Sequence, residues 1–421
     1  MIENDAVKRR LDDLFGDEFA PGGAFDLSPL RDALHALGDP HDKLPRTIHI
    51  AGTNGKGSTC AFLRAIAEAQ GVRVHAFTKP HLLKTRERVR LAGALVSDDA
   101  FLAAIDRVAQ TKAPLRHFEA QLAAALLLFA ETPADLLILE TGVGGTHDAT
   151  NVIAKPAATI VTPIAADHAA LLGSHIAEIA AHKAGILKKG AHAIVTRQTG
   201  EAQSAIEARA EKIGAPLLRA GQEWDAFAQN ERLIVQTQRR LFDLPLPSLP
   251  GVHQIENAGA AVVALDQIID LTDEAAAKGV TSARHPARME RLPSERGELW
   301  LDGAHNPHAA LALARTLDDL ARRAPRHVVL IVGMLARKDA AGFLSPLASK
   351  ADSILTTPIA GQDSISGEVL ARLAATNAQP TASLEQALNE ARARSPDARI
   401  VVCGSLALAA EAYRLYGLTV D

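Results

Sequence analysis

The stretch "AGTNGKGSTC" (residues 51–60) joins a short apolar segment, "RTIHIAG" (46–52), to a segment with helical spacing of its apolar residues, "STCAFLRAIAEAQ" (58–70). A strand, a glycine-rich loop and a helix in this order are typical of a phosphate-binding unit in an α/β domain. The usual G-x-x-x-x-G-K-[ST] pattern is not met, because Gly57 follows Lys56 and the hydroxyls come later, at Ser58 and Thr59. The stretch therefore predicts an α/β fold with an unusual nucleotide site.

Short apolar segments and helical segments alternate along the following part of the chain, which is typical of a mostly parallel sheet covered by helices. Strands are predicted at 46–52, 72–78, 135–142, 158–164 and 192–196, and helices at 58–70, 98–110, 118–131 and 252–269. The continuous apolar run at 135–142 indicates a central strand.

A second, smaller α/β unit is predicted beyond a basic, proline-containing stretch at 278–293, where the apolar periodicity lapses. A chain of 421 residues exceeds the size at which one core usually keeps growing. We therefore predict an N-terminal P-loop ATPase domain at 1–283 and a Rossmann-like domain at 284–421.

Composition argues against several classes of protein. A formal net charge of −4 gives no reason to expect a nucleic-acid partner. The longest apolar run, at 122–130, is too short to cross a bilayer, and the N-terminus lacks the apolar stretch of a signal peptide. Cys60 and Cys403 lie far apart in apolar surroundings and predict buried thiols in a reducing compartment. A cytoplasmic protein without a membrane or nucleic-acid partner is expected.

The residue types of the loop suit phosphate binding. Glycines at 52, 55 and 57 let backbone N–H groups approach phosphates, and Lys56 adds a positive charge at a helix N-terminus. A glycine-rich turn with an incidental lysine is the alternative, but the added hydroxyl pair favours nucleotide binding. The predicted nucleotide contacts are Gly52, Thr53, Asn54, Gly55, Lys56, Gly57, Ser58 and Thr59.

Further motifs occur in order along the whole chain. They are "KPHLLKTRERVRLAG" (79–93), "LETGVGGTHDATN" (139–151), "TPIAADHAALLGSHIAEIAAHKAGILKKG" (162–190), "LPGVHQIENA" (249–258), "ARMERL" (287–292), "LDGAHNP" (301–307), "GML" (333–335) and "GSL" (404–406). With the loop, this set resembles the folylpolyglutamate synthase/dihydrofolate synthase family of the Mur ligase superfamily. The resemblance implies a cytoplasmic, monomeric ligase of folate biosynthesis and one-carbon metabolism that uses ATP and magnesium.

The resemblance implies a metal site at Glu140, His168 and Lys183, and catalytic roles for Lys56, His168 and Lys183. Glu140 also ends a predicted buried strand, where open α/β sheets place their ligands, and carboxylate oxygens suit Mg²⁺. In the family the equivalent of Lys183 is carbamylated, so N6-carboxylysine is expected here. A solitary histidine or lysine would more often be structural.

The resemblance also implies nucleotide contacts from Asn257, Arg288, Asp302 and His305, and substrate contacts from Lys79, His81, Phe118 and Asp148. The implied reaction is amide formation. The carboxylate of a pterin-linked acid, dihydropteroate or tetrahydrofolate, attacks the γ-phosphate of ATP, and the amine of L-glutamate then displaces phosphate from the acyl phosphate.

The chain departs from the family pattern near the expected metal and acceptor sites. Lys79 stands where the family has a serine that ligates the first Mg²⁺, and Thr146, which His147 follows, stands where it has an arginine. His182 stands in place of a glutamate, and Leu122 stands in place of a threonine. Lysine cannot ligate Mg²⁺ while protonated. Three interpretations stay open: a working folate ligase with a rearranged metal site, a paralogous ligase for another acid or amine, and a nucleotide-binding protein without catalysis.

Overall fold

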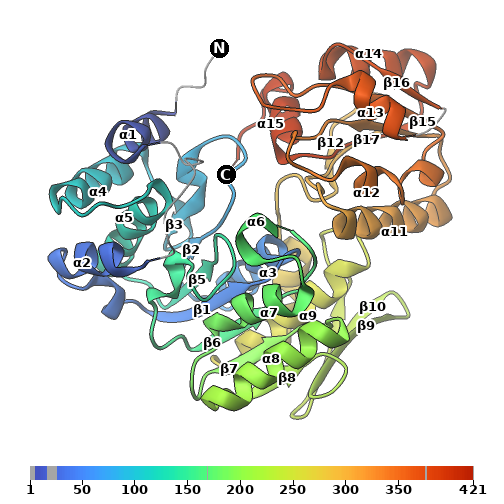
Figure 1. Ribbon diagram of the computed structural model, residues 1–421. Coiled ribbons are helices and arrows are strands. Elements are labelled where there is room, and N and C mark those ends of the chain that lie inside the picture. Colours follow the sequence, from blue (N-terminus) through green and yellow to red (C-terminus); the bar gives the residue numbers. More distant parts are fainter. Residues whose placement is uncertain (1–4, 17–25, 168, 375–376, 421) are drawn as a thin grey trace. The chain divides into compact units, whose positions relative to one another are not determined.

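The computed structural model describes residues 5–16, 26–167, 169–374 and 377–420, which form two compact units (Figure 1). The first unit contains the chain up to Ser248 together with Ile255–Arg284. The second unit contains Leu249–Gln254 and His285–Val420. Each unit has a sheet and a hydrophobic core of its own.

The first unit contains an eight-stranded sheet in the order β4-β3-β2-β5-β1-β6-β7-β8. The strands are β1 (Arg46–Ala51), β2 (Val74–Phe77), β3 (Val89–Leu91), β4 (Ala94–Leu95), β5 (Leu136–Glu140), β6 (Ala158–Val161), β7 (His192–Val195) and β8 (Leu217–Arg219). Neighbours from β2 to β8 pair in parallel, whereas β3 and β4 are antiparallel additions at one edge. The carboxyl ends of β1, β2, β5 and β6 therefore meet at one edge of the sheet.

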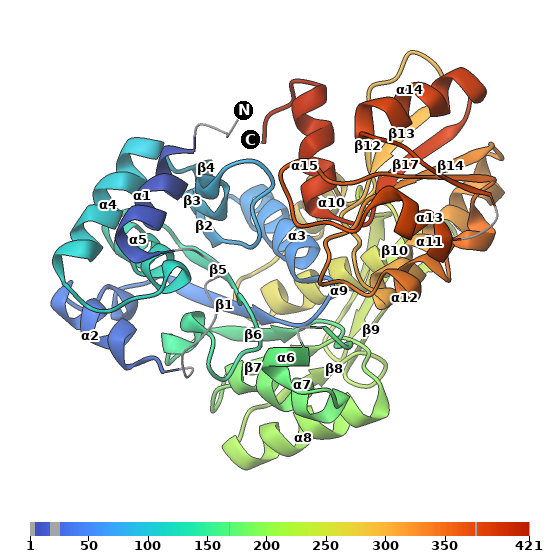
Figure 2. The same ribbon diagram turned by 45° about the horizontal axis from the view of Figure 1, so that its top comes forward.

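The helices of the first unit are α1 (Ala6–Phe15), α2 (Ser28–Ala36), α3 (Lys56–Ala69), α4 (Asp98–Gln110), α5 (His117–Glu131), α6 (Ala169–Leu172), α7 (Ile176–Lys183), α8 (Gly200–Ile213), α9 (His253–Asp266) and α10 (Asp273–Ser282). Helices α1, α4 and α5 lie at one end of the sheet, and α7 and α8 lie at the other (Figure 2). Helix α3 packs against β1, β2 and β5, and α10 packs on α3.

A small antiparallel sheet completes the first unit. Its strands are β9 (Trp224–Gln229), β10 (Arg232–Thr237) and β11 (Leu241–Pro245). Alternate residues of β10, Leu233 and Val235, are fully buried, so one face of this sheet faces the core.

The second unit contains a six-stranded sheet in the order β12-β13-β17-β14-β15-β16. Its strands are β12 (Glu290–Leu292), β13 (Glu298–Leu301), β14 (Val328–Val332), β15 (Ser353–Thr356), β16 (Ala378–Pro380) and β17 (Arg399–Cys403), and only β12 is antiparallel. Its helices are α11 (Pro307–Arg323), α12 (Ala340–Leu344), α13 (Gly367–Ala374), α14 (Leu384–Arg394) and α15 (Leu406–Leu415). Strands β13, β14 and β17 form the buried centre of the unit.

The predicted fold class is confirmed, and each predicted strand from 46 to 196 is present with slightly narrower bounds. The helix after the phosphate loop begins at Lys56 and not at Ser58, because Gly55 serves as its N-cap with a φ of 89°. Among the described residues, no helix is long and apolar enough to span a membrane.

Candidate nucleotide and metal site

Backbone geometry at the phosphate loop requires two of its glycines. Gly52 has a φ of 150°, and a Cβ added there would lie 1.8 Å from Thr162 Oγ1. Gly55 has a φ of 89°, and a Cβ there would lie 2.6 Å from Asn257 Oδ1. Both positions therefore exclude a side chain. The second contact places Asn257, which is buried, directly against the loop, and its contact with a nucleotide stays a prediction.

The segment after β6 forms hydrogen bonds with Thr53 and Asn54 of the phosphate loop. The N–H groups of Thr53 and Asn54 donate to the Pro163 carbonyl oxygen at 3.0 and 3.2 Å. Thr53 Oγ1 donates to the Ala165 carbonyl at 3.0 Å and accepts from the Ala165 N–H at 3.1 Å. These bonds hold the loop in shape ahead of the N-terminus of α3, where backbone N–H groups and the helix dipole favour an anion.

Two lysine side chains converge on the same carbonyl oxygen of this loop. Lys56 Nζ donates to the carbonyl oxygens of Gly52 and Thr53, both at 3.1 Å. Lys183 Nζ, from the end of α7, donates to the Gly52 carbonyl at 2.8 Å. A single carbonyl oxygen thus accepts hydrogen bonds from two amines beside the predicted phosphate position.

Lys183 is 5% exposed, and its burial is the largest cause of a pKa lowered to about 7. The positive charge of Lys56 lowers the pKa further, whereas Asp167 and Asp148 raise it. At neutral pH a large fraction of this amine is therefore unprotonated. A neutral amine is nucleophilic, which is the state that a reaction with CO₂ requires.

The shifted pKa of Lys183 predicts a pH-dependent stability. The folded state binds a proton at Lys183 only below about pH 7, whereas an unfolded lysine binds one up to about pH 10.5. The cost of burying the charge is fully present below pH 7 and is relieved as the pH rises toward 10.5. In CO₂-free buffer, the free energy of unfolding of wild type relative to Lys183→Met should therefore rise between pH 7 and 10, measured by urea denaturation. A difference independent of pH would contradict the shift.

Glu140 ends β5 and is 2% exposed. Its Oε2 accepts a hydrogen bond of 3.0 Å from the backbone N–H of Lys79, which follows β2. Its negative charge also raises the pKa of the buried Cys60 thiol in α3, after the larger effect of burial. The carboxylate therefore lies at the sheet edge close to α3, and its role as a metal ligand stays a prediction.

The fit to Mg²⁺ is judged from the chemistry of two buried oxygen donors, one on Glu140 and one on Thr59. Thr59 is fully buried in α3, and its Oγ1 has no hydrogen-bond partner among the residues that the structure describes. A buried carboxylate and an unsatisfied hydroxyl are hard oxygen donors of the kind that Mg²⁺ prefers. Within the described ranges, no group of three or more His, Cys, Asp or Glu side chains is assembled for a metal. His168, the predicted second ligand, lies outside the described residues.

Phe118, at the start of α5, lies close to Lys79, which follows β2, and to Gly142, which follows β5. Its ring is 4.5 Å from Lys79 Nζ, and a Cβ added at Gly142 would lie 2.8 Å from its Cζ. Three of the predicted positions, Lys79, Phe118 and Glu140, are thus brought together with the loop that follows β5. Of the remaining predicted substrate residues, His81 follows Lys79 by two residues, and Asp148 lies in the loop that follows β5.

Asp148 caps the short 3-10 helix Ala149–Val152 and is buried. Oδ2 accepts from the Val143 N–H at 2.7 Å, and Oδ1 accepts from the N–H and hydroxyl of Thr150 at 3.0 and 2.5 Å. In the free protein these bonds fix the glycine-rich loop. A contact between Asp148 and the pterin stays a prediction.

A buried polar chain continues from Asp148 into the sheet. His49 Nε2 lies 2.8 Å from Thr150 Oγ1, and burial, with a smaller effect of Lys188, lowers the pKa of His49 to about 3. Because the Thr150 hydroxyl donates to Asp148, the neutral His49 ring must donate to Thr150 through Nε2. Sequence reasoning missed His49 and Thr150, although "DATN" contains the capping pattern.

Removing the Thr150 hydroxyl should therefore leave buried partners unsatisfied. Thr150→Val is expected to lower the free energy of unfolding by about 1–3 kcal/mol, measured by chemical denaturation. Thr159→Val is the matched control, because Thr159 is equally buried and its hydroxyl has no hydrogen-bond partner within the described part of the chain. Equal losses in both variants would show that the hydrogen bonds from His49 through Thr150 to Asp148 contribute nothing to the free energy of unfolding.

His81 follows β2, and its ring accepts a hydrogen bond from a buried arginine. Arg88 Nε donates to His81 Nδ1 at 2.9 Å, and Arg88 Nη1 donates to Gln121 Oε1 at 2.7 Å. Gln121 Nε2 lies 2.8 Å from His117 Nδ1. Sequence reasoning missed Arg88, Gln121 and His117, since the chain joins segments separated by 33 residues.

Two of the departures from the family pattern have structural explanations. The N–H and hydroxyl of Thr146 both donate to the His182 carbonyl oxygen, at 2.7 and 3.1 Å, so Thr146 fixes the end of the helix that carries Lys183. Leu122 is fully buried among the helices of the N-terminal core. The exposed His147 lies with its ring centroid 6.0 Å from that of His182.

In the second unit, Asp302 organises the predicted nucleotide residues. Its Oδ2 accepts from the Met289 N–H at 2.9 Å, and its Oδ1 accepts from the Ala304 N–H at 2.8 Å. Burial raises the pKa of Asp302, and the charge of Arg288 opposes this. A Cβ at Gly303 would lie 2.5 Å from Arg288 Nη1, and His305 Nδ1 lies 2.8 Å from the Gly303 carbonyl. Arg288, Asp302 and His305 therefore lie together.

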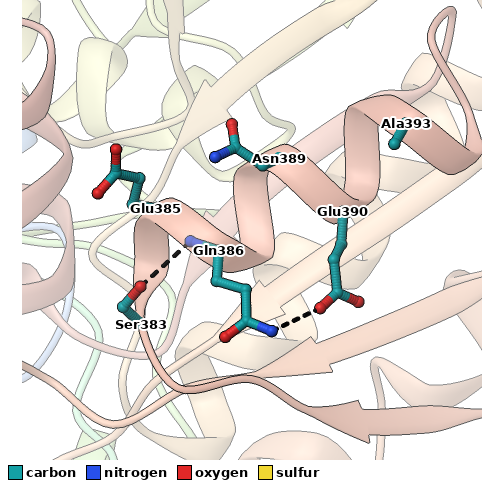
Figure 3. A pocket seen from close by; sticks show the side chains of 6 residues that line it. All are labelled: Ser383, Glu385, Gln386, Asn389, Glu390 and Ala393. Carbon is teal, nitrogen blue, oxygen red and sulfur yellow. Dashed lines mark hydrogen bonds between the residues drawn. The ribbon is translucent and has the colours of Figure 1, made fainter.

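A shallow hollow of about 520 Å³ along α14 is unrelated to these residues. Ser383 Oγ accepts from the Gln386 N–H, and the Gln386 side chain donates to Glu390 (Figure 3). Three of the residues that line the hollow thus bond to one another, and no predicted site residue lines it.

Comparison with known proteins identifies the family of the chain. The Mur ligase middle domain matches residues 50–265, and the Mur ligase glutamate ligase domain matches residues 287–406. The chain is 34% identical over 366 residues to the dihydrofolate synthase/folylpolyglutamate synthase of Escherichia coli, covering 86% of this chain and 84% of that protein.

Two solved structures extend the likeness to three dimensions. E. coli FolC in complex with DHPP and ADP gives a TM-score of 0.89 at 32% identity, covering 97% of this chain and 96% of that chain. A bifunctional folylpolyglutamate synthase/dihydrofolate synthase with Mn, AMPPNP and L-glutamate bound gives 0.86 at 33% identity, covering 94% and 95%.

The fold, the phosphate loop and the carboxylate at the end of β5 define a Mur-type ligase with separate ATP-binding and glutamate ligase domains. Within that class the identity spreads over both domains and nearly the full length of both chains. The chain belongs to the dihydrofolate synthase/folylpolyglutamate synthase family.

Proposed function

We propose that the chain is an ATP-dependent ligase that joins L-glutamate to a pterin-linked carboxylate, dihydropteroate or tetrahydrofolate, through an acyl phosphate. The convergence of Lys56 and Lys183 on the Gly52 carbonyl, at the N-terminus of α3, carries this proposal. It prepares a hydrogen-bonding cradle for the terminal phosphates of ATP, in which Lys56 supplies the positive charge. The relatives that bind DHPP with ADP, and AMPPNP with L-glutamate, support the choice of substrates.

In the first step, the loop and Lys56 hold the γ-phosphoryl group. A carboxylate oxygen of the acid attacks the γ-phosphorus, and the bond from phosphorus to the β-phosphate oxygen breaks to release ADP. Phosphoryl transfer depends mainly on positioning and on neutralising charge, which Lys56 and the backbone N–H groups at the N-terminus of α3 supply.

In the second step, the neutral amine of L-glutamate attacks the carbonyl carbon of the acyl phosphate. The tetrahedral intermediate expels inorganic phosphate, and the nitrogen loses a proton, which leaves an amide. Lys56 remains beside the leaving phosphate and stabilises its charge.

Glu140 and Thr59, with His168, would hold Mg²⁺, which supplies charge neutralisation at the phosphate oxygens when bound. We propose that Lys183 carries a carbamate, formed when its neutral amine bonds to CO₂ and loses a proton. The lowered pKa and burial of Lys183 support this, because they favour the nucleophilic form. The modification would replace a cation with an anionic oxygen ligand.

Other roles follow the same proposal. Asn257, Arg288, Asp302 and His305 contact the nucleotide, whereas His81, Phe118 and Asp148 contact the acid. The domain limits are 1–283 and 284–421. The two cysteines are buried and free, which supports a cytoplasmic enzyme. We propose a monomer without a nucleic-acid partner.

The substrate test is a panel of acids, each incubated with ATP and L-glutamate and scored by phosphate release and product mass. Dihydropteroate or tetrahydrofolate should give ADP and a product heavier by one glutamyl residue. Turnover with only another acid would establish that the chain is a paralogous ligase. The observation that favours this alternative is the position of Lys79 beside Phe118, among the predicted substrate residues. ATP binding with no turnover on any acid would establish a non-catalytic protein.

A further inference from the structure

Lys79 stands at the sheet edge directly beside Glu140. Strands β2 and β5 pair in parallel with Phe77 opposite Leu139, so the residues that follow them are neighbours. The backbone N–H of Lys79 donates to Glu140 Oε2 at 3.0 Å. The main chain of Lys79 is therefore bound to the buried carboxylate that we place at the metal site.

The ammonium group of Lys79 has a defined position. Nζ lies 4.5 Å from the centroid of the Phe118 ring, within the range of a cation–π interaction. The ring is itself fixed, because it packs on Phe77 at 5.8 Å between centroids and leaves no room for a side chain at Gly142. The cation thus lies beside the loop that follows Glu140.

The charge of Lys79 has a chemical consequence for metal binding. A buried carboxylate such as Glu140 requires a compensating cation, which can be a metal ion or an ammonium group. An ammonium group has three donors and no acceptor, so it neutralises charge without ligating a metal. It also repels a divalent cation placed next to it. A serine at this position would instead offer a metal ligand.

We propose that the ammonium group of Lys79, held over the Phe118 ring at this sheet edge, takes the place of one divalent cation, so that this ligase binds one divalent ion with its nucleotide where a serine at position 79 would permit two. The remaining ion uses Glu140 and its neighbours, and Lys79 supplies the second positive centre. This inference rests on the proposed function only in requiring ATP at Gly52–Thr59.

Counting bound Mn²⁺ tests the inference without turnover. Wild type is saturated with AMPPNP, and bound Mn²⁺ is measured by equilibrium dialysis with electron paramagnetic resonance. We expect one Mn²⁺ per chain in wild type, two in Lys79→Ser, and one in Lys79→Met, which removes the charge without adding a ligand. Lys155→Ser, at an exposed lysine of the same unit, should keep one.

Two Mn²⁺ per chain in wild type would overturn the inference, as would one in a Lys79→Ser variant that still binds AMPPNP. The wild-type count decides the matter even where a variant does not fold. Failure of this inference can be told apart from failure of the proposed function, because the Mn²⁺ count requires neither the acid nor L-glutamate. A wild-type chain that binds no AMPPNP would contradict the ATP site itself, whereas a chain that binds AMPPNP with two Mn²⁺ contradicts only the role of Lys79.

Discussion

Lys56→Ala is expected to lower ATP-dependent ligation on the order of 10²- to 10³-fold, the largest effect among the substitutions considered. Lys56 is the first residue of α3, and its amine reaches the carbonyls of Gly52 and Thr53 across the loop. The amine of Lys183 donates to the same Gly52 oxygen. Initial rates of ADP release, with substrates saturating, measure the loss.

Two controls separate catalysis from folding in this experiment. Lys155→Ala changes an exposed lysine of the same unit and should keep the wild-type rate. The thermal unfolding midpoint of Lys56→Ala should stay close to that of wild type, because the lost bonds are two hydrogen bonds at a partly exposed loop. A rate for Lys56→Ala equal to that of Lys155→Ala would remove Lys56 from the mechanism.

Lys183→Ala is expected to lower turnover about 10²-fold, the second largest effect. The substitution removes both the bond to Gly52 and the carbamate that we propose. The signature of the carbamate is a dependence on CO₂: wild type should lose activity in CO₂-free buffer and recover it when bicarbonate is added. A ¹³C resonance from labelled bicarbonate should appear in wild type and be absent from Lys183→Ala.

The control for Lys183 is the Lys183→Met variant, which keeps the length of the side chain. It should be as inactive as Lys183→Ala and insensitive to bicarbonate. Full activity of either variant, or wild-type turnover that does not change when CO₂ is removed, would contradict the carbamate.

Much of the fold was predictable from sequence because the strands of a parallel sheet are buried on both faces. Continuous apolar runs such as that of β5 are strong local signals. The small sheet of β9, β10 and β11 was not predicted, because its short strands include charged and polar residues and lie next to charged turns, which weakens the alternating pattern. The start of α3 was misplaced by two residues because a glycine N-cap in the left-handed region has no side-chain signal.

The individual site segments were predictable from short motifs, but the contacts between them were not. That Lys56 and Lys183 share the Gly52 carbonyl depends on where α7 ends relative to β1, over a separation of 131 residues. The bond between Arg88 and Gln121 behind His81 is equally non-local. Such partners leave no periodic trace in the sequence.

The positions of Thr146 and His182 illustrate what the structure adds. The family pattern has an arginine and a glutamate there, and the sequence shows only that both are changed. In the structure the two positions are in contact, through the Thr146 N–H and the His182 carbonyl. The backbone bond that positions Lys183 is therefore formed here without an arginine or a glutamate at these positions.

The central claim, ligation through an acyl phosphate, is tested most directly by following oxygen from the acid. Dihydropteroate labelled with ¹⁸O in its carboxylate is incubated with the enzyme, ATP, Mg²⁺ and L-glutamate, and the released phosphate is analysed by mass spectrometry. Attack of the carboxylate on the γ-phosphorus predicts one ¹⁸O in each phosphate released with the amide product. Formation of the glutamyl product with unlabelled phosphate would contradict the account.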